Sequence, residues 1–201
     1  MLVFLILDRS FFQRSTLSVA KDLLGKVLVH HSALGVTSGR IVETEAYLGP
    51  EDQAAHSSGG KRTARNDVMF QEKGYAYVYF IYGLYHCFNI TTGDVFGKPE
   101  AVLIRALQPL EGVDLMFKRR SKIKNIVDLA NGPSKLCLAM DITKKQNKHD
   151  LTVSPLFLKD APSIPDEDII QKTRIGIDYS GEWKNRPWRF YIKENKYISK
   201  K

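Results

Sequence analysis

The chain has 201 residues, of which 43% are hydrophobic and 26% charged, so it can bury a sizeable core without disulfides or metals. Its 30 Lys and Arg residues outnumber 22 Asp and Glu residues, and the formal net charge is +8. A basic chain favours polyanionic partners, either nucleic acid or an anionic membrane, although many proteins are basic without binding either. Composition therefore predicts a globular protein and leaves its partner open.

The cysteines and the amino-terminal residues indicate the compartment. Cys87 and Cys137 are far apart and have no second ligand at zinc-site spacing, which argues against a disulfide scaffold and a zinc finger. The apolar residues 1–7 are few, lack a basic lead-in and are followed directly by Asp8 and Arg9. Neither a signal peptide nor a membrane span is therefore expected, and we predict a cytoplasmic protein.

The first predicted elements are a helix and a strand. Apolar residues at helical spacing predict a helix over residues 16–24, with Thr16 able to cap its start and Gly25 suited to end it. Residues 26–30 follow as a strand, and a Gly- and Ser-containing turn leads to a second strand.

The second strand, residues 41–47, carries two candidate carboxylates. Because side chains alternate along a strand, Glu43, Glu45 and Tyr47 are expected to share one face with Ile41. Neighbours on that face lie about 7 Å apart. Carboxylates beside an aromatic ring could form a site, but on spacing alone a solvated face is the more common outcome.

A small basic loop follows at residues 57–66. Its Gly-Gly-Lys-Arg-Thr segment lacks the spacing of a phosphate-binding P-loop. We interpret the loop as backbone amides together with Lys61, Arg62 and Arg65 that face phosphates. An ordinary solvated loop fits the sequence about as well.

The most aromatic stretch, residues 74–92, predicts a β-hairpin. Tyr75, Tyr77 and Tyr79 alternate with other residues as in a strand, and Tyr82 precedes a turn glycine. Aromatic rings usually fill cores, but burial is least expected for Tyr82 beside the turn.

Residues 100–107 predict a mostly apolar strand with a charge near its end. Arg105 should meet a carboxylate or a phosphate there, because an unpaired buried charge is costly. A helix is expected over residues 111–120, then a mobile polar linker over 121–131. A Gly-Pro pair begins a further helix, whose first turn with Lys135 is a reasonable phosphate contact.

The last part of the chain predicts three short strands, at residues 151–154, 173–177 and 188–192. No internal repeat or domain linker is evident. We therefore predict a mixed α/β (α+β) fold in one domain, with a curved, mainly antiparallel sheet, peripheral helices and a protruding β-hairpin. The domain spans residues 1–201, with its core at about 12–192 and a frayed lysine-rich tail at 193–201.

Several of these stretches, taken in order, resemble one enzyme family. They are residues 40–57, 77–90, 101–110, 132–137 and parts of 174–191. The most specific motifs are Glu-Thr-Glu-Ala-Tyr-Leu-Gly-Pro-Glu-Asp and Tyr-x-Tyr-x-x-Tyr-Gly-x-Tyr. From about Phe12 to Tyr191 the chain resembles the alkyladenine (3-methyladenine) DNA glycosylase family.

The resemblance implies a DNA repair glycosylase that flips damaged purines out of duplex DNA and hydrolyses the N-glycosidic bond, leaving an abasic site. Glu45 would be the general base that activates water, chosen over Glu43 only by the family match, and Arg105 would hold it in register. The implied base pocket consists of Tyr47, His56, Tyr79 and Asn89.

The resemblance also implies how the protein would engage double-stranded DNA. Tyr82 would intercalate into the gap left by the flipped base, and His56 would assist the release of neutral lesions. The implied backbone contacts are Lys61, Arg62, Thr63, Arg65, Ser134 and Lys135. No metal or other cofactor and no membrane is implied, no lysine occupies the nucleophile position, and a monomer is expected.

Two other functions remain open at this point. One is a magnesium-dependent nuclease with its carboxylates around the metal. Its candidate ligands are Glu43, Glu45, Asp52 and Asp67. The other is a non-catalytic nucleic-acid-binding module whose aromatic hairpin stacks on bases. Neither explains the full ordered match, so the glycosylase ranks first.

Overall fold

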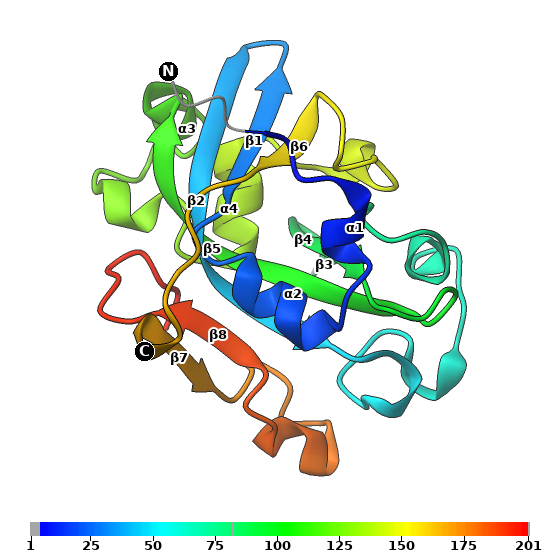
Figure 1. Cartoon of the computed structure of the whole chain (residues 1–201). Helices are drawn as coiled ribbons and strands as arrows, with labels where there is room; N and C mark the ends of the chain where they lie inside the picture. The colour runs from blue at the N-terminus through cyan, green and yellow to red at the C-terminus, as the bar shows by residue number, and fades with distance from the viewer. Residues whose placement is uncertain (1–4, 82, 201) are drawn as a thin grey trace.

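The computed structural model of the chain describes residues 5–81 and 83–200. The fold is built around one antiparallel sheet (Figure 1). Its strands run in the order β3-β4-β5-β2-β1-β6, and β8 pairs with both β2 and β7. The strands are β1 (Val27–Ser32), β2 (Gly35–Tyr47), β3 (Ala76–Ile81), β4 (Tyr85–Thr92), β5 (Glu100–Glu111), β6 (Leu156–Lys159), β7 (Ile169–Lys172) and β8 (Arg189–Ile192).

Short helices lie around the sheet, with α2 in front of it and α4 behind it in the view of Figure 1. The α-helices are α1 (Arg9–Phe12), α2 (Thr16–Asp22), α3 (Val113–Arg119) and α4 (Pro133–Met140). The 3-10 turns are η1 (Gly49–Glu51), η2 (Ser58–Gly60), η3 (Asp67–Phe70), η4 (Ile126–Asp128), η5 (Lys144–Gln146), η6 (Asp166–Asp168) and η7 (Gly181–Asn185). The predicted fold class, a single domain with a curled antiparallel sheet and peripheral helices, is confirmed.

Side-chain alternation divides β3, β4 and β5 into a core face and a polar or aromatic face. The core face carries Ala76, Val78, Phe88, Ile90, Val102 and Ile104. The opposite face, which lines a cavity, carries Tyr77, Tyr79, Cys87, Asn89, Leu103 and Arg105. The predicted hairpin is present as β3 and β4, paired from Ala76 with Ile90 to Ile81 with Tyr85.

A β-bulge in β2 changes which residues share a face. Ile41 pairs with Leu107 and Glu43 with Ala106, so one residue of β2 has no opposite partner. Ile41 packs in the main core, whereas Glu43 contacts Arg105 on the other side of the sheet. The prediction that Ile41 shares a face with the two glutamates is therefore wrong, because strict alternation fails at a bulge.

Several predicted boundaries differ from the structure. Thr16 does not cap α2; Ser15 is the N-cap residue, and the Thr16 hydroxyl donates to the buried Glu100 carboxylate at 2.5 Å. The expected mobile linker over 121–131 contains η4 and the fully buried Leu129 and Ala130. The polar residues on either side of Leu129 and Ala130 led to the prediction of a linker, although these two residues pack into the core.

The later strands are placed differently from the prediction. Neither 151–154 nor 173–177 is a strand, and the chain instead forms β6 and β7, whereas β8 agrees with the predicted 188–192 within one residue at its start. Short strands depend on the partner that they pair with more than on their own propensity, so sequence locates them poorly.

The carboxyl-terminal residues are packed, which corrects the predicted frayed tail. Tyr197 and Ile198 are each 8% exposed and pack with Val42 and Tyr191 in a second, smaller core cluster. Two aromatic or aliphatic side chains therefore fix residues that a lysine-rich composition marks as solvated.

Within the described ranges, no helix has the length and apolarity that crossing a membrane requires.

Substitution of Gly112, which lies between β5 and α3, tests whether this connection needs a residue without a side chain. Its φ is +68°, and a Cβ atom there would lie 2.1 Å from the Val36 carbonyl oxygen. We expect Gly112→Ala to lower the free energy of unfolding by about 2 to 5 kcal/mol in urea titrations, from left-handed strain plus overlap. Gly97→Ala is the matched control: its φ is +79° with nothing within 4 Å of the added Cβ, so only about 1 to 2 kcal/mol is expected. Equal losses of unfolding free energy in the two variants would contradict the predicted overlap between the added Cβ atom and the Val36 carbonyl oxygen.

Candidate active site

Strand register brings the key residues into one row across the sheet. Tyr77 of β3 is opposite Asn89 of β4, Asn89 is opposite Leu103 of β5, and Leu103 is opposite Glu45 of β2. Arg189 of β8 continues the row beside Glu45. Directly opposite residues in a sheet point to the same face, so residues far apart in sequence share one surface.

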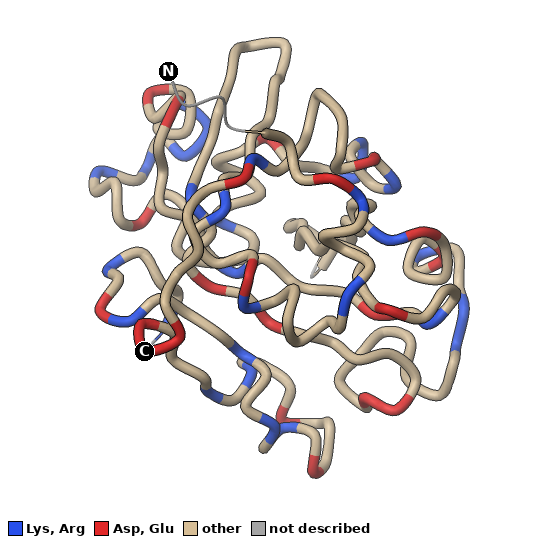
Figure 2. The backbone as a smooth tube through the Cα atoms, in the orientation of Figure 1, with Lys and Arg blue, Asp and Glu red and all other residues tan. Residues whose placement is uncertain are grey.

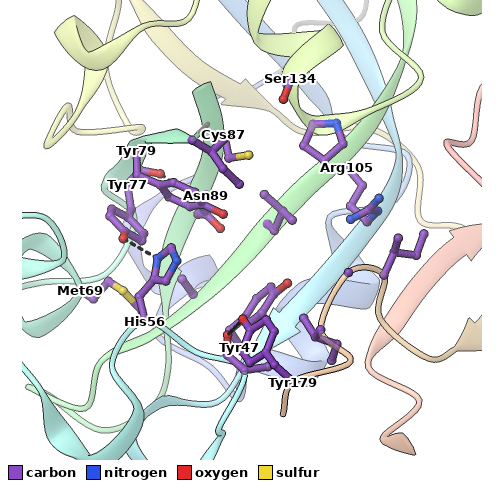
Figure 3. Close-up of a pocket in the computed structure, with 18 residues that line it drawn as sticks. Tyr47, His56, Met69, Tyr77, Tyr79, Cys87, Asn89, Arg105, Ser134 and Tyr179 are labelled. Carbon is purple, nitrogen blue, oxygen red and sulfur yellow. Dashed lines mark hydrogen bonds between the residues drawn. The ribbon is translucent and has the colours of Figure 1, made fainter. Parts of the chain in front are cut away.

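Tyr77, Asn89 and Leu103 of this row line a cavity of about 360 Å³, within the range of small-molecule sites (Figure 3). His56, Tyr77 and Tyr79 gather on one side of it, Arg105 lies on the other, and Tyr47 and Tyr179 lie between them (Figure 3). Of the predicted site residues, the cavity wall includes Tyr47, His56, Tyr79, Asn89, Arg105 and Ser134.

Glu45 is fully buried and held by three different donors. The Ile175 backbone N–H donates to its Oε1 at 2.8 Å, and the Tyr47 hydroxyl donates to its Oε2 at 2.9 Å. An Arg105 guanidinium nitrogen lies 3.3 Å from the same Oε2. All three partners line the cavity, whereas Glu45 itself lies behind them. The carboxylate is thus fixed in orientation at the cavity wall.

Arg105 lies in an apolar strand, and nearby carboxylates compensate the cost of burying its charge, as expected from the sequence. Besides Glu45, its Nε lies 3.4 Å from Glu43 Oε1. Burial alone would lower the pKa of the guanidinium, but Glu45 and Glu43 outweigh burial and raise it. Arg105 is a permanent cation whose charge is divided between two carboxylates.

An aromatic cluster forms the other wall. The His56 ring lies 4.6 Å from the Tyr79 ring, edge to face, and its Nδ1 is 2.8 Å from the Tyr77 hydroxyl. His56 lines the cavity, and the residue as a whole remains exposed. Burial first, and then the nearby charge of Arg65, lower its pKa from 6.5 to about 4. At neutral pH the imidazole is therefore uncharged and offers one donor and one acceptor.

Burial also keeps the cavity tyrosines protonated. It raises the pKa of Tyr77 to about 12, and it also raises the pKa values of Tyr47 and Tyr79 well above the ordinary value. The nearby Glu45 carboxylate adds to the shift at Tyr47. Asn89 donates its side-chain N–H to the Tyr77 carbonyl at 3.1 Å, which fixes its amide against the cavity.

The basic loop before the hairpin is exposed over residues 59–65 and carries Lys61, Arg62 and Arg65 within five positions. Figure 2 shows the basic positions along the backbone. Arg62 forms an ion pair with Asp67 at 2.7 Å, and the Arg65 guanidinium lies 4.6 Å over the Tyr79 ring. Thr63 donates its backbone N–H and its hydroxyl to Asn66. Lys61 forms no ion pair with any described residue.

The helix expected after the Gly-Pro pair is α4, with Pro133 in its first turn. Ser134 lines the cavity there, while Lys135 is exposed and donates to Asn131 Oδ1 at 2.7 Å. Tyr82, the predicted intercalating residue, lies outside the described residues.

The carboxylates of the magnesium hypothesis each have a cationic partner. Glu43 and Glu45 contact Arg105, Asp52 pairs with Arg174 at 2.5 Å, and Asp67 pairs with Arg62 and Lys148. Across residues 5–81 and 83–200, no His, Cys, Asp and Glu side chains cluster as a metal site would require. Glu43 and Glu45 share Arg105, whereas Asp52 and Asp67 pair with other cations, so each carboxylate takes part in an ion pair with a basic side chain.

Sequence reasoning missed the loop 173–180, which it expected to be partly a strand. Arg174 is buried, pairs with Asp52, and lies 4.7 Å over the Tyr47 ring. Ile175 then supplies its N–H to Glu45. The only signal in the sequence was the Arg-Ile-Gly-Ile motif, because a backbone donor carries no residue type that marks it.

Comparison with known proteins identifies the family. A family model described as Methylpurine-DNA glycosylase (MPG) matches residues 10–196. The chain is 50% identical to a Clostridium botulinum protein, over 98% of this chain and 100% of that protein. It is 49% identical to a Methanocella arvoryzae protein and 50% identical to one from Legionella pneumophila. Each of the three is named "Putative 3-methyladenine DNA glycosylase".

The aromatic cavity, the buried carboxylate and these similarities define a DNA repair enzyme that hydrolyses N-glycosyl bonds. The chain belongs to the methylpurine-DNA glycosylase family. It is thus a monofunctional DNA N-glycosylase that acts on alkylated bases, which confirms the predicted resemblance.

The surroundings of His56 predict an unusual titration. We expect its ring protons in NMR spectra to titrate near pH 4 rather than near 6.5. The folded protein then binds this proton less tightly than the unfolded chain, so His56 makes stability fall as pH drops from about 6.5 to 4. His56→Gln should assign the signal and flatten this dependence. Arg65→Ala should raise the midpoint; a wild-type midpoint between 6 and 7 would contradict the account.

Proposed function

We propose that this enzyme extrudes an alkylated purine from duplex DNA into the cavity and hydrolyses its N-glycosyl bond with water, leaving an abasic site. The observation that carries the proposal is the fully buried Glu45, oriented by Tyr47, Arg105 and Ile175 at the wall of an aromatic cavity. An oriented carboxylate beside a slot for a flat ring suits attack at the sugar carbon that bears that ring.

The cavity favours damaged over normal purines through its rings. A purine alkylated at a ring nitrogen is cationic and electron-poor, so aromatic faces attract it by stacking and by cation–π attraction. Tyr47, His56 and Tyr79 supply these faces. Asn89, fixed by the Tyr77 carbonyl, would screen out bases with a clashing exocyclic group.

Hydrolysis needs one base and one good leaving group. Water oxygen bonds to C1′ as the C1′–N bond breaks, the bonding electrons leave with the purine, and the water proton passes to Glu45. A cationic purine becomes neutral as it leaves, so no acid is required. Arg105 keeps Glu45 in place, and the carboxylate also stabilises positive charge on the sugar. For a neutral lesion such as hypoxanthine, uncharged His56 is the candidate hydrogen-bond partner of the base.

Extrusion of a base needs a residue that fills the gap, and Tyr82 is the proposed wedge. Backbone contacts would come from the loop before the hairpin and the start of α4, through Lys61, Arg62, Thr63, Arg65, Ser134 and Lys135. We propose that a monomer makes these contacts. Two free, buried cysteines suit the reducing cytoplasm, where this DNA would be found.

Base release tests the proposal directly. Wild-type enzyme, in chelator, should release the base from duplexes that carry one alkylated or etheno purine. The strand should stay uncut until alkali is added, because water and not a lysine attacks. Glu45→Gln should lower the single-turnover rate by about 10² to 10⁴-fold, the usual contribution of a general base.

Its control is Glu167→Gln, an exposed carboxylate in η6 that should leave the rate unchanged. Release that survives in Glu45→Gln would remove Glu45 as the base. No release from any lesion, despite salt-sensitive binding, would overturn the proposal.

Salt dependence tests the backbone contacts. Lys61→Ala should reduce the slope of log affinity against log salt by about 0.9, the value for one phosphate contact. Arg62→Ala should change the slope less, because Asp67 already neutralises Arg62. Fluorescence anisotropy of an undamaged duplex at several salt concentrations measures both slopes, and identical slopes for wild type and Lys61→Ala would refute the contact.

A further inference from the structure

The carboxyl-terminal segment and Glu43 together brace the site from behind. We propose that Glu43 and residues 197–200 are positioning groups that hold Arg105 against Glu45, a role that rests on the function proposed above. Neither group lines the cavity. Each would act on the reaction only through Arg105.

Glu43 is fully buried and uses both oxygens. Its Oε1 accepts from an Arg189 guanidinium nitrogen at 2.9 Å and faces Arg105 Nε at 3.4 Å. Its Oε2 accepts the Ser199 backbone N–H at 2.6 Å. A carboxylate with this set of donors cannot follow Arg105 if that side chain swings away, so it defines a fixed position for the guanidinium.

Arg105 is held from two directions. One terminal nitrogen faces Glu45 at 3.3 Å, while Nε faces Glu43. Ser199 Oγ accepts from Nε at 3.4 Å and from the other terminal nitrogen at 3.3 Å. Because an arginine side chain has several rotatable bonds, a single contact to Glu45 would leave its planar head free to turn. The contacts with Glu43 and Ser199 remove that freedom.

The tail is itself anchored where it meets this cluster. Tyr197 and Ile198 are buried against the second core cluster, and the Lys200 carbonyl accepts from Arg189 at 2.8 Å. Ser199, between these anchors, therefore has a defined position.

Charge balance gives Glu43 a second effect. Glu45, Arg105, Glu43 and Arg189 form a buried series of alternating charges, two negative and two positive. Neutralising Glu43 leaves two guanidinium groups with one carboxylate, and their repulsion would displace Arg105 from its present position.

The test compares Glu43→Gln with a matched buried carboxylate. Glu100→Gln is the control, because Glu100 is also buried in the sheet, where it accepts from Thr16 and pairs with Lys98, and has no contact with Arg105. Single-turnover release is measured with saturating enzyme, so that the rate constant does not depend on the folded fraction, together with duplex affinity and the thermal midpoint.

Glu43→Gln should lower the rate constant by about 10- to 100-fold, the range for a displaced positioning group, with duplex affinity within about twofold. Glu100→Gln should lower the thermal midpoint but keep the wild-type rate constant. Ser199→Ala, which keeps the backbone N–H and loses the hydroxyl, should lower the rate less than Glu43→Gln, and Glu43→Asp should restore part of it.

A second measurement does not depend on catalysis. The Nε–H signal of Arg105 in ¹⁵N NMR spectra, assigned with Arg105→Lys, should exchange slowly with water in wild type and in Glu100→Gln but rapidly in Glu43→Gln. A wild-type rate and a slow signal in Glu43→Gln would overturn the inference, as would equal loss of rate in Glu100→Gln. If the wild type releases no base, the proposed function fails, and the Nε–H signal alone decides whether Glu43 positions Arg105.

Discussion

The buried series of charges formed by Glu45, Arg105, Glu43 and Arg189 is the interaction on which the site depends. Removing one partner of a buried ion pair typically costs about 3 to 5 kcal/mol, because the remaining charge stays desolvated. Two arginines and two glutamates neutralise each other here, and Glu45, at the end of the series nearest the cavity, is thereby kept charged and fixed in orientation. The series joins β2, β5, β8 and the tail behind one cavity wall.

Strand pairing decides where these charges meet. The register aligns Glu45 with Leu103, Asn89 and Tyr77, and the bulge after Ile41 brings Glu43 to the face of Arg105. A shift of the β2 register by one residue would point the Glu45 side chain into the apolar core, which offers its carboxylate no cationic partner. The pairing of the strands thus places the aromatic and the charged residues of the cavity on the same face of the sheet.

Much of the fold could be predicted where local pattern decides the structure. Alternating residues in the aromatic stretch predicted β3 and β4, and the cost of a lone charge predicted a carboxylate or phosphate partner for Arg105, of which the structure shows carboxylates. Predictions failed where distant segments decide: the expected linker buries Leu129, and the expected frayed tail buries Tyr197 and Ile198. Two or three apolar residues among polar ones are a weak signal until a partner surface is known.

By itself the sequence determined the class of fold, because this follows from composition and periodicity along the chain. Its ordered motifs also carried the resemblance to the family, and it was this resemblance that selected the residues for the chemistry. Only the tertiary structure decided that Ile175 donates its backbone N–H to Glu45, that Arg65 lies over Tyr79, and that Ser199 reaches Glu43. Each of these contacts joins segments separated by many residues. The free energy that forms them comes from packing and desolvation in three dimensions, which no local pattern encodes.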